Sequence, residues 1–257
     1  MSIPPAADLK TITGFIADYA TRLLGSGVHT SRVVRNSKRI GIALCVQVKM
    51  TIFAKSIILT VADEQNEDIC TEVLEIPELP VSFELNSDLS SLSWEAHDKK
   101  MSLNEIQNKY AQIIDKPQIQ PLLVLFLVSI ANAAFCRLFG GDWGAMGIVF
   151  IATSCGFFAK QQMQKRKISP FIIVVISSFI ASLVASISLL FNIRADIAIA
   201  TSVLYLIPGV PLLNGVIDII EGHILIGFSR LAQSFLLVIC IAIGLSFTLV
   251  IFKNSLL

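Results

Sequence analysis

The second half of the chain carries five long apolar stretches, and this feature constrains the fold more than any other. They lie near residues 119–138, 143–160, 170–191, 196–213 and 231–252. A helix needs about 20 apolar residues to cross a bilayer, and each stretch comes close to that length. A mean hydropathy of +0.73, with 54% hydrophobic and 15% charged residues, is also unlike that of soluble globular chains. The sequence therefore predicts an α-helical integral membrane protein with five transmembrane helices.

Charged residues divide the chain into two parts. Residues 1–116 carry 12 Lys or Arg and 15 Asp or Glu, whereas residues 117–257 carry 8 and 4. In the first part, apolar residues at helical spacing predict helices over 8–24, 31–44, 88–99 and 102–114, the last with a capping box at Ser102 and Glu105. Alternation predicts strands over 46–52, 56–62 and 79–85. We expect an α+β domain over residues 1–116 and a transmembrane domain over residues 117–257.

Positive charges in the short loops predict the orientation in the membrane, because Lys and Arg favour the cytoplasmic side. The segment from Lys160 to Lys167 holds four positive charges, whereas the loops at 140–142 and 192–195 hold one between them. Residues 1–21 lack the apolar core of a signal peptide. We therefore expect the N-terminal domain in the cytoplasm and, after five spans, the C-terminus outside.

The fourth apolar stretch is broken by helix-breaking residues, and polar residues follow it: Pro208, Gly209 and Pro211, then Asn214, Asp218 and Glu221. Such breaks are tolerated where neighbouring helices or a watery cavity bind the freed backbone groups, and they are typical of substrate sites in transporters. Alternatively, the break ends the span and the acids lie on a solvated loop. If residues 213–228 are one helix, the polar side chains share a face. That face turns either toward a pore or partner, or toward water at the inner membrane surface.

Further polar residues lie in or near the other spans. Asn132, Arg137 and Asp142 lie around the first expected external turn. Arg137 is suited either to binding a substrate carboxylate with its fork of donors or to anchoring the helix end at the headgroups. The third span carries serines at four-residue spacing, a ridge suited to close helix packing or to substrate binding: Ser178, Ser182 and Ser186.

Other function classes find little support in the sequence. The net charge of +1 and the absence of a concentrated basic face argue against nucleic-acid binding. The five cysteines form no CxxC pair and no metal-ligand spacing, so we expect no metal, cofactor or disulfide. The chain has no GxSxG, HExxH or phosphate-binding glycine loop, so we do not expect an enzyme.

Three segments carry a resemblance to a known family. They are Leu206 to His223, followed by Gly227 and Arg230; Cys136 to Trp143; and Leu23 to Val34. In that order, they resemble the Pro-Gly-x-Pro signature, the first external turn and the opening of the cytoplasmic domain in the threonine/serine exporter family. The resemblance covers most of residues 10–252. Many members have acids where this chain has His29 and Val34, so roles of those acids do not carry over.

The resemblance implies a function in export. Full-length members have a cytoplasmic domain and ten spans, so this chain is similar to the larger subunit of a split form. That implies a bacterial inner-membrane protein that works with a second small five-span membrane protein, in a higher oligomer. The implied substrates are small and carry a carboxylate, namely succinate or another dicarboxylate, or threonine and serine. The alternative is a membrane-anchored ligand sensor or scaffold.

The candidates for a substrate path or for coupling combine these observations: Pro208, Gly209, Pro211, Asn214, Asp218, Glu221, His223, Arg230, Asn132, Arg137 and Asp142. Asp218 and Glu221 are the strongest candidates for coupling, because an acid in a partly desolvated site has a raised pKa and exchanges protons near neutral pH. Alternatively, the two acids stabilise the positive start of the helix near Asn214. His29 is either a proton sensor or a solvated surface residue.

Overall fold

A computed structural model describes residues 9–63, 68–117, 119–191 and 194–252. The chain divides into two compact units, and each is described by itself. The first unit comprises Met1–Pro117 and Val210–Leu231, and the second comprises Gln118–Gly209 and Ala232–Leu257. The expected helix start at Asp8 and the expected loop at Asn192 and Ile193 lie outside the described residues.

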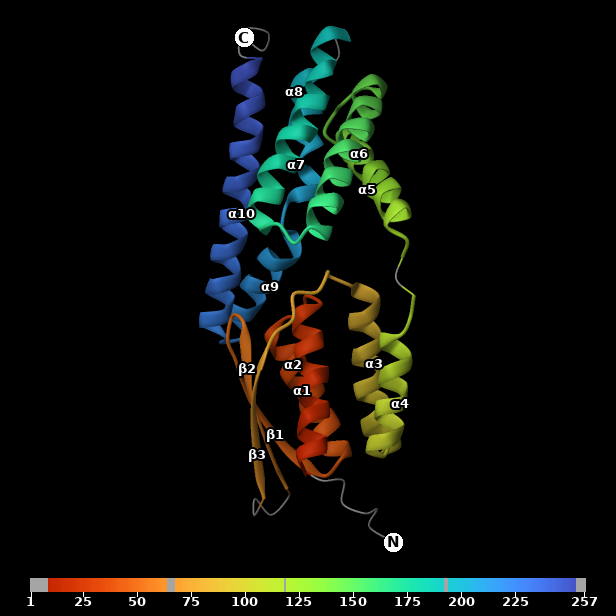
Figure 1. The fold of residues 1–257 in the computed structure, drawn as a ribbon, viewed down its shortest axis with the longest axis vertical. Helices are drawn as coiled ribbons and strands as arrows, with labels where there is room; N and C mark the ends of the chain where they lie inside the picture. Colours follow the sequence, from red (N-terminus) through yellow and green to blue (C-terminus); the bar gives the residue numbers. More distant parts are fainter. Residues whose placement is uncertain (1–8, 64–67, 118, 192–193, 253–257) are drawn as a thin grey trace. The chain divides into compact units, whose positions relative to one another are not determined.

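The N-terminal part of the first unit is built in layers. Its elements are α1 (Leu9–Gly25), α2 (Thr30–Ala43), β1 (Val46–Ile52), β2 (Ser56–Asp63), β3 (Ile69–Glu75), α3 (Phe83–Lys99) and α4 (Leu103–Ile114). The strands form an antiparallel sheet in the order β1-β2-β3, with Met50 opposite Leu59. Helices α1 and α2 lie against the sheet, and α3 and α4 lie beyond them (Figure 1).

The core of this unit forms where the sheet meets the two inner helices. Alternate residues of β2, Ile57, Leu59 and Val61, are fully buried because successive side chains of a strand point to opposite faces. Tyr19 of α1 is fully buried as well, and its hydroxyl donates a 2.8 Å hydrogen bond to the Leu89 carbonyl oxygen of α3. That bond satisfies a polar group that would otherwise be costly to bury.

The four helices and the first two strands predicted for this part are present, whereas the third predicted strand is not. Residues 79–85 form no strand, because α3 begins at Phe83 and the Ser82 hydroxyl caps it by accepting a hydrogen bond from the Leu85 N–H. Strand β3 was missed, although residues 69–75 alternate in exposure as a strand should. The capping box at Ser102 and Glu105 is confirmed, and the Glu105 carboxylate accepts the Ser102 N–H at 2.8 Å.

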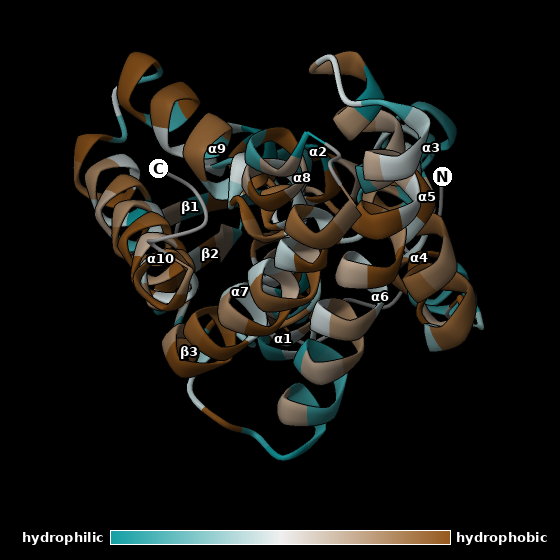
Figure 2. Ribbon diagram, turned by 90° about the horizontal axis from the view of Figure 1, so that it is seen from above, coloured by the Kyte–Doolittle hydropathy of each residue, from teal (hydrophilic) through white to brown (hydrophobic). Residues whose placement is uncertain are grey.

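The rest of the chain is helical: α5 (Pro121–Leu138), α6 (Trp143–Lys165), α7 (Pro170–Ala185), the 3-10 helix η1 (Ser186–Phe191), α8 (Ala195–Ser202), the 3-10 helix η2 (Leu204–Leu206), α9 (Gly209–Ile220) and α10 (Ile224–Ile251). Four helical segments in the described residues are long and apolar enough to cross a membrane, and a bent pair, 195–206 with 209–220, makes a possible fifth. Figure 2 shows hydrophobic residues along α9 and α10.

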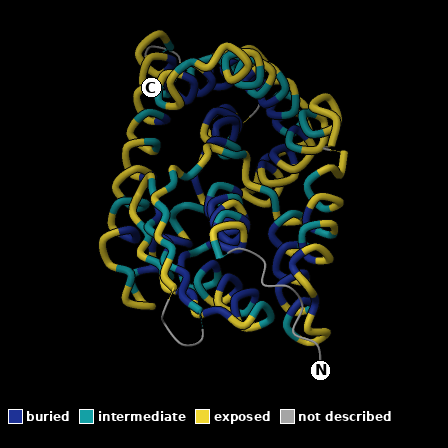
Figure 3. The backbone as a smooth tube through the Cα atoms, turned by 60° about the horizontal axis from the view of Figure 1, so that its bottom comes forward, coloured by how far each residue is buried: buried dark blue, intermediate teal, exposed yellow. Residues whose placement is uncertain are grey.

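The helices differ from the expected spans at three boundaries. Helix α6 runs on to Lys165, so part of the basic segment from Lys160 is helix rather than loop. The fourth span is interrupted, and α10 begins at Ile224 instead of near residue 231. Only 22% of the most apolar window of α10 is buried within the chain, and exposed positions line the helix that leads to the C-terminus in Figure 3. Lipid or another subunit is the natural cover for such a surface.

Small residues allow close packing inside the second unit. A Cβ on Gly244 of α10 would lie 2.4 Å from the Val175 carbonyl oxygen of α7. The Ser178 hydroxyl donates to the Ile241 carbonyl oxygen at 2.8 Å, and Ser182 and Thr248 share a 2.7 Å hydrogen bond. The serine ridge of α7 therefore packs against α10, as the packing alternative predicted.

Candidate functional site

The break in the fourth apolar stretch lies at Ile207 and Pro208. Helix α8 ends at Ser202, and its last carbonyls lose their helical partners there. The Asn132 side-chain amide, on α5, donates hydrogen bonds to the Thr201 carbonyl oxygen at 3.0 Å and to the Thr153 hydroxyl at 2.6 Å. Asn132 thus satisfies freed backbone groups at the end of α8, which is the condition under which a broken helix is tolerated in a membrane.

Helix α9, which starts at Gly209 directly after the break, is polar on its buried side. Asn214 and Asp218 are buried, whereas Leu213, Val216 and Ile220 are 62%, 46% and 78% exposed. A helix of a soluble protein shows the opposite arrangement. The polar face packs onto other parts of the first unit, and the apolar face is left for lipid or another subunit.

Asp218 is the centre of a group that we call the Asp218 cluster: Val28, Thr30, Asp218 and Arg230. The carboxylate of Asp218 is fully buried. Its Oδ1 accepts a hydrogen bond from the Thr30 backbone N–H, and its Oδ2 accepts one from the Arg230 Nη1, both at 2.8 Å. The Arg230 Nη2 donates to the Val28 carbonyl oxygen at 3.1 Å. One ion pair therefore joins α9, the first turns of α10 and the turn between α1 and α2.

The turn between α1 and α2 has backbone groups that need these partners. Helix α1 ends in a Schellman motif: Gly27 has a φ of +91°, its N–H donates to the Leu24 carbonyl, and the Val28 N–H donates to the Leu23 carbonyl. Helix α2 then starts at Thr30, and its N-cap residue His29 makes no side-chain capping bond. Asp218 supplies the missing carboxylate, which the positive end of α2 favours.

The other side of the cluster is a second turn of the same kind. Helix α9 ends at Ile220, Gly222 has a φ of +88°, and the His223 N–H donates to the Asp218 carbonyl oxygen at 2.7 Å. Residues 213–228 therefore do not form one continuous helix, because α9 ends before Gly222 and α10 starts at Ile224. His223 takes part through its backbone, and Asn214 donates its side-chain amide to the Gly27 carbonyl oxygen at 2.8 Å.

Glu221 lies just past the end of α9 and forms looser ion pairs. Its carboxylate is 3.9 Å from the His29 Nε2 and 3.6 Å from the Arg35 Nη1. A hydrogen bond from Ser31, with the positive charge of Arg35, lowers the pKa of Glu221. Burial lowers the pKa of His29, and the negative charges of Glu221 and Asp218 oppose that shift only in part. The folded chain therefore favours an ionised Glu221 and a neutral His29.

Two glycines let α9 and α10 approach closely beside the Asp218 cluster. A Cβ on Gly227 would lie 2.7 Å from the Gly215 carbonyl oxygen and 2.7 Å from the side chain of Ile219. A Cβ on Gly215 would lie 2.9 Å from the side chain of Leu231. The short hairpin of α9 and the start of α10 therefore depends on residues without side chains at its crossing point.

The remaining sequence candidates make local contacts; all but Pro211 lie in the second unit. The Arg137 Nη1 donates to the Gly141 carbonyl oxygen at 3.0 Å, and its guanidinium lies 5.3 Å from the centre of the Trp143 ring. Asp142 caps α6 by accepting the Ala145 N–H at 2.7 Å. Pro211 lies in the first turn of α9, where a missing N–H costs little. Pro208 and Gly209 stand at the break itself.

Sequence reasoning missed the residues of the α1–α2 turn that complete the site. Val28 and Thr30 contribute only backbone groups, so their residue types gave no signal. Arg35 was not among the candidates. One signal was available: α2 starts without a capping Ser, Thr, Asp or Asn side chain at its N-cap, which indicates that another segment caps it. Among the residues that the structure describes, no group of His, Cys, Asp and Glu is suited to hold a metal ion.

Comparisons with known proteins agree with this architecture. A family model described as "Putative threonine/serine exporter" matches residues 14–252. The chain is 28% identical over 243 residues to the "Probable succinate transporter subunit YjjP" of Klebsiella aerogenes, covering 93% of each chain. It is 28% identical over 251 residues to the protein of the same name from Escherichia coli K12, covering 94% of this chain and 95% of that one. No solved structure matches. Because the family match spans nearly all of the sequence, the chain belongs to the threonine/serine exporter family.

Proposed function

We propose that this chain is one subunit of a bacterial inner-membrane exporter of small carboxylate-bearing metabolites, and that a second small five-span membrane protein completes it. Family membership supports export, and the names of two relatives support both a subunit role and succinate as a substrate. Threonine and serine remain in the proposed substrate class because the family description names them.

The observation that carries this proposal is the buried charge that follows the helix break. Buried ionisable residues are expensive and are usually paired, and beside membrane spans they often mark functional sites. Asp218 and Arg230 form such a pair next to a broken apolar stretch, and two of their partners are backbone groups of the α1–α2 turn. A scaffold needs only helices that cross the membrane. Here α9, the helix that follows the break, also binds the N-terminal part of the chain through Asp218.

In the proposed mechanism, the Asp218–Arg230 pair couples transport to a change in this junction. Competition from a substrate carboxylate for Arg230 would break the ion pair and leave the Asp218 carboxylate held only by the Thr30 N–H. The hairpin of α9 and α10 would then be free to separate from the α1–α2 turn. Such a two-state element is what a transport cycle requires.

The proposed placement in the membrane follows the loop charges. Lys165 ends α6, Arg166 and Lys167 follow it, and these positive charges favour the cytoplasmic side for the connection to α7. The N-terminal part is then cytoplasmic and, with the bent pair counted as one span, the C-terminus is outside. Five helices rarely enclose a whole pathway, so we propose that the transporter is a higher oligomer of both subunits.

The test is efflux of labelled succinate, threonine and serine from bacterial cells that lack their own exporters for these compounds. The chain is expressed alone, with a candidate five-span partner encoded beside it, and with that partner carrying a disrupted span. We expect efflux only with the intact pair. Absence of efflux of all three compounds, with both proteins shown to be inserted in the membrane, would overturn the proposal and favour a ligand sensor.

A further inference from the structure

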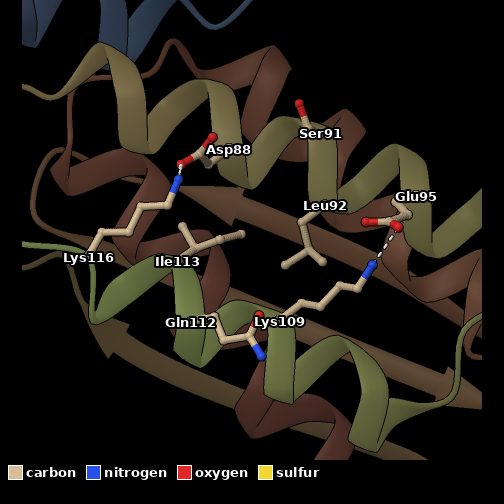
Figure 4. Close-up of a pocket in the computed structure, with 8 residues that line it drawn as sticks. All are labelled: Asp88, Ser91, Leu92, Glu95, Lys109, Gln112, Ile113 and Lys116. Carbon is tan, nitrogen blue, oxygen red and sulfur yellow. Dashed lines mark hydrogen bonds and ion pairs between the residues drawn. The ribbon is translucent and has the colours of Figure 1, made fainter.

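The first unit contains two cavities of a size to hold a small ligand. The first, of about 340 Å³, lies between α3 and α4 and is shown in Figure 4. Its charges are already paired, because Lys116 binds Asp88 at one end and Lys109 binds Glu95 at the other. Leu92 and Ile113 line the middle. Such a cavity offers no unsatisfied charge to a ligand.

The second cavity, of about 240 Å³, lies at the turn between α1 and α2. Its lining comes from that turn, from the start of α3 and from the start of α9: Gly27, Val28, His29, Arg32, Phe83, Asn86, Ser87, Val210, Leu213 and Asn214. This lining includes one arginine and one histidine and no acidic residue. Ligand pockets for drug-sized molecules measure about 300–1,000 Å³, so this cavity suits a smaller molecule.

Arg32 is the unsatisfied group in this cavity. It is half-buried, and its guanidinium makes no hydrogen bond or ion pair with any residue that the structure describes. By contrast, Arg35 on the same helix forms an ion pair with Glu221. Arg39 donates hydrogen bonds to Asn36 and Ser93 and stacks over the Trp94 ring. Arg32 also lies in the first turn of α2, where a positive charge is unfavourable and an anion is favoured.

The walls of the cavity are fixed by other bonds. The Asn86 amide donates to the Ser26 carbonyl oxygen at 3.1 Å, and the Asn214 amide donates to the Gly27 carbonyl oxygen at 2.8 Å. These residues hold the α1–α2 turn in place from two sides. An incoming anion therefore meets a preformed site, which lowers the entropic cost of binding.

We infer that this cavity binds a small carboxylate anion and that Arg32 is its principal anchor. A guanidinium binds a carboxylate through two parallel hydrogen bonds, and His29 adds a second donor on the same wall. The identity of the ligand as an exported metabolite rests on the proposed function, whereas the binding site itself does not. The cavity shares Asn214 with the polar face of α9, so its occupancy would bear directly on the α9 junction.

The experiment is calorimetric titration of the purified full-length chain in detergent, with succinate, threonine and the neutral diamide succinamide as probes. We expect at least one of the two carboxylates to bind and succinamide not to bind. Arg32→Gln should weaken binding by about tenfold or more, the loss expected for a charge-assisted hydrogen bond. Lys38→Gln, an exposed change on the same helix, should leave the affinity unchanged.

A second variant tests the place of binding. Ser87 is exposed and lines the cavity, so Ser87→Met should fill the space without burying a polar group, and it should weaken binding even if Arg32→Gln folds poorly. The inference is overturned if neither carboxylate binds a folded protein, or if both Arg32→Gln and Ser87→Met bind as the unmodified chain does. Binding without export by the paired subunits would overturn the proposed function alone, and export with unaltered binding in both variants would overturn this inference alone.

Discussion

Asp218 caps a helix that starts 188 residues earlier in the chain. At the scale of single residues, this is the most consequential contact of the site, because the same carboxylate also neutralises Arg230. Of the two sequence-based alternatives for Asp218, coupling or capping, the structure supplies a capping bond, although for α2 and not for its own helix. A charged capping residue that can be released is compatible with both capping and coupling. Coupling by Asp218 therefore stays a proposal.

The first prediction concerns this buried pair. Asp218→Asn removes the carboxylate charge that Arg230, whose side chain is 18% exposed, binds in the folded chain, and breaking a buried pair in this way costs about 3–5 kcal/mol. Chemical unfolding of the purified chain in detergent measures this loss. The double variant Asp218→Asn/Arg230→Gln removes both charges and should recover most of the stability. If the pair also couples transport, the double variant should be stable and still fail to export. Normal export by the double variant would show that the pair has only a structural role.

The second prediction concerns pH and His29. Burial lowers the pKa of His29 in the folded chain, so below its ordinary pKa of 6.5 the unfolded chain binds more protons than the folded one. Stability should therefore fall as the pH drops from 6.5 through the lowered pKa. The lowered pKa of Glu221 acts in the same direction but only below 4.5.

The measurement is the unfolding midpoint at about pH 7.5 and about pH 5.5, a window that contains the ordinary pKa of His and lies above that of Glu. We expect the chain to lose stability toward the lower pH and His29→Gln to lose much less. An equal loss in both proteins would show that other groups cause the pH dependence.

At the scale of elements, the close crossing of α9 and α10 gives the third prediction. Gly227→Ala places a Cβ 2.7 Å from the Gly215 carbonyl oxygen, so the hairpin must open. Such overpacking costs about 1–3 kcal/mol. Gly14→Ala, in the middle of α1 with nothing within 4 Å, is the matched control and should be neutral or stabilising by about 0.5–1 kcal/mol. Equal effects of the two changes in an unfolding experiment would contradict the close crossing.

The break between η2 and α9 gives the fourth prediction. Pro211 is one of the helix-breaking residues of this segment, but it lies in the first turn of α9, where proline is tolerated. Pro208 stands at the break, so Pro208→Ala should impair export of the paired subunits while Pro211→Ala has little effect. If the efflux assay instead shows a greater loss of export for Pro211→Ala than for Pro208→Ala, the break depends on Pro211.

How far the sequence predicts the structure depends on the range of the contacts. The spacing of apolar residues and the capping residues predicted most helices and two strands, because these signals are local. Ser102 and Glu105 of the capping box, for example, are three residues apart. Ser82 was a local signal as well, but the alternation of residues 79–85 masked it. The Asp218 cluster could not be predicted from the sequence, because Thr30 and Val28 take part in it through backbone atoms. Contacts of backbone atoms leave no pattern in the residue types.

At the scale of the whole molecule, the compact units do not follow the change in composition near residue 117. Val210–Leu231 belongs to the first unit although it lies among the apolar stretches. Composition divides the chain by solvent preference, whereas the polar face of α9 finds its partners in the N-terminal part. Large apolar side chains on α5, such as Phe126 and Leu122, are 51% and 75% exposed, which leaves surface for lipid and for a second subunit.

The proposed pathway therefore needs both subunits in one membrane, and transport by the purified pair tests the account most directly. The two subunits are co-purified, reconstituted into proteoliposomes loaded with labelled succinate, threonine or serine, and followed for release of the label. We predict release of at least one of these compounds from liposomes with both subunits, little release with either subunit alone, and a strong reduction with Asp218→Asn/Arg230→Gln. Retention of all three compounds by liposomes that contain the folded, inserted pair would contradict the account.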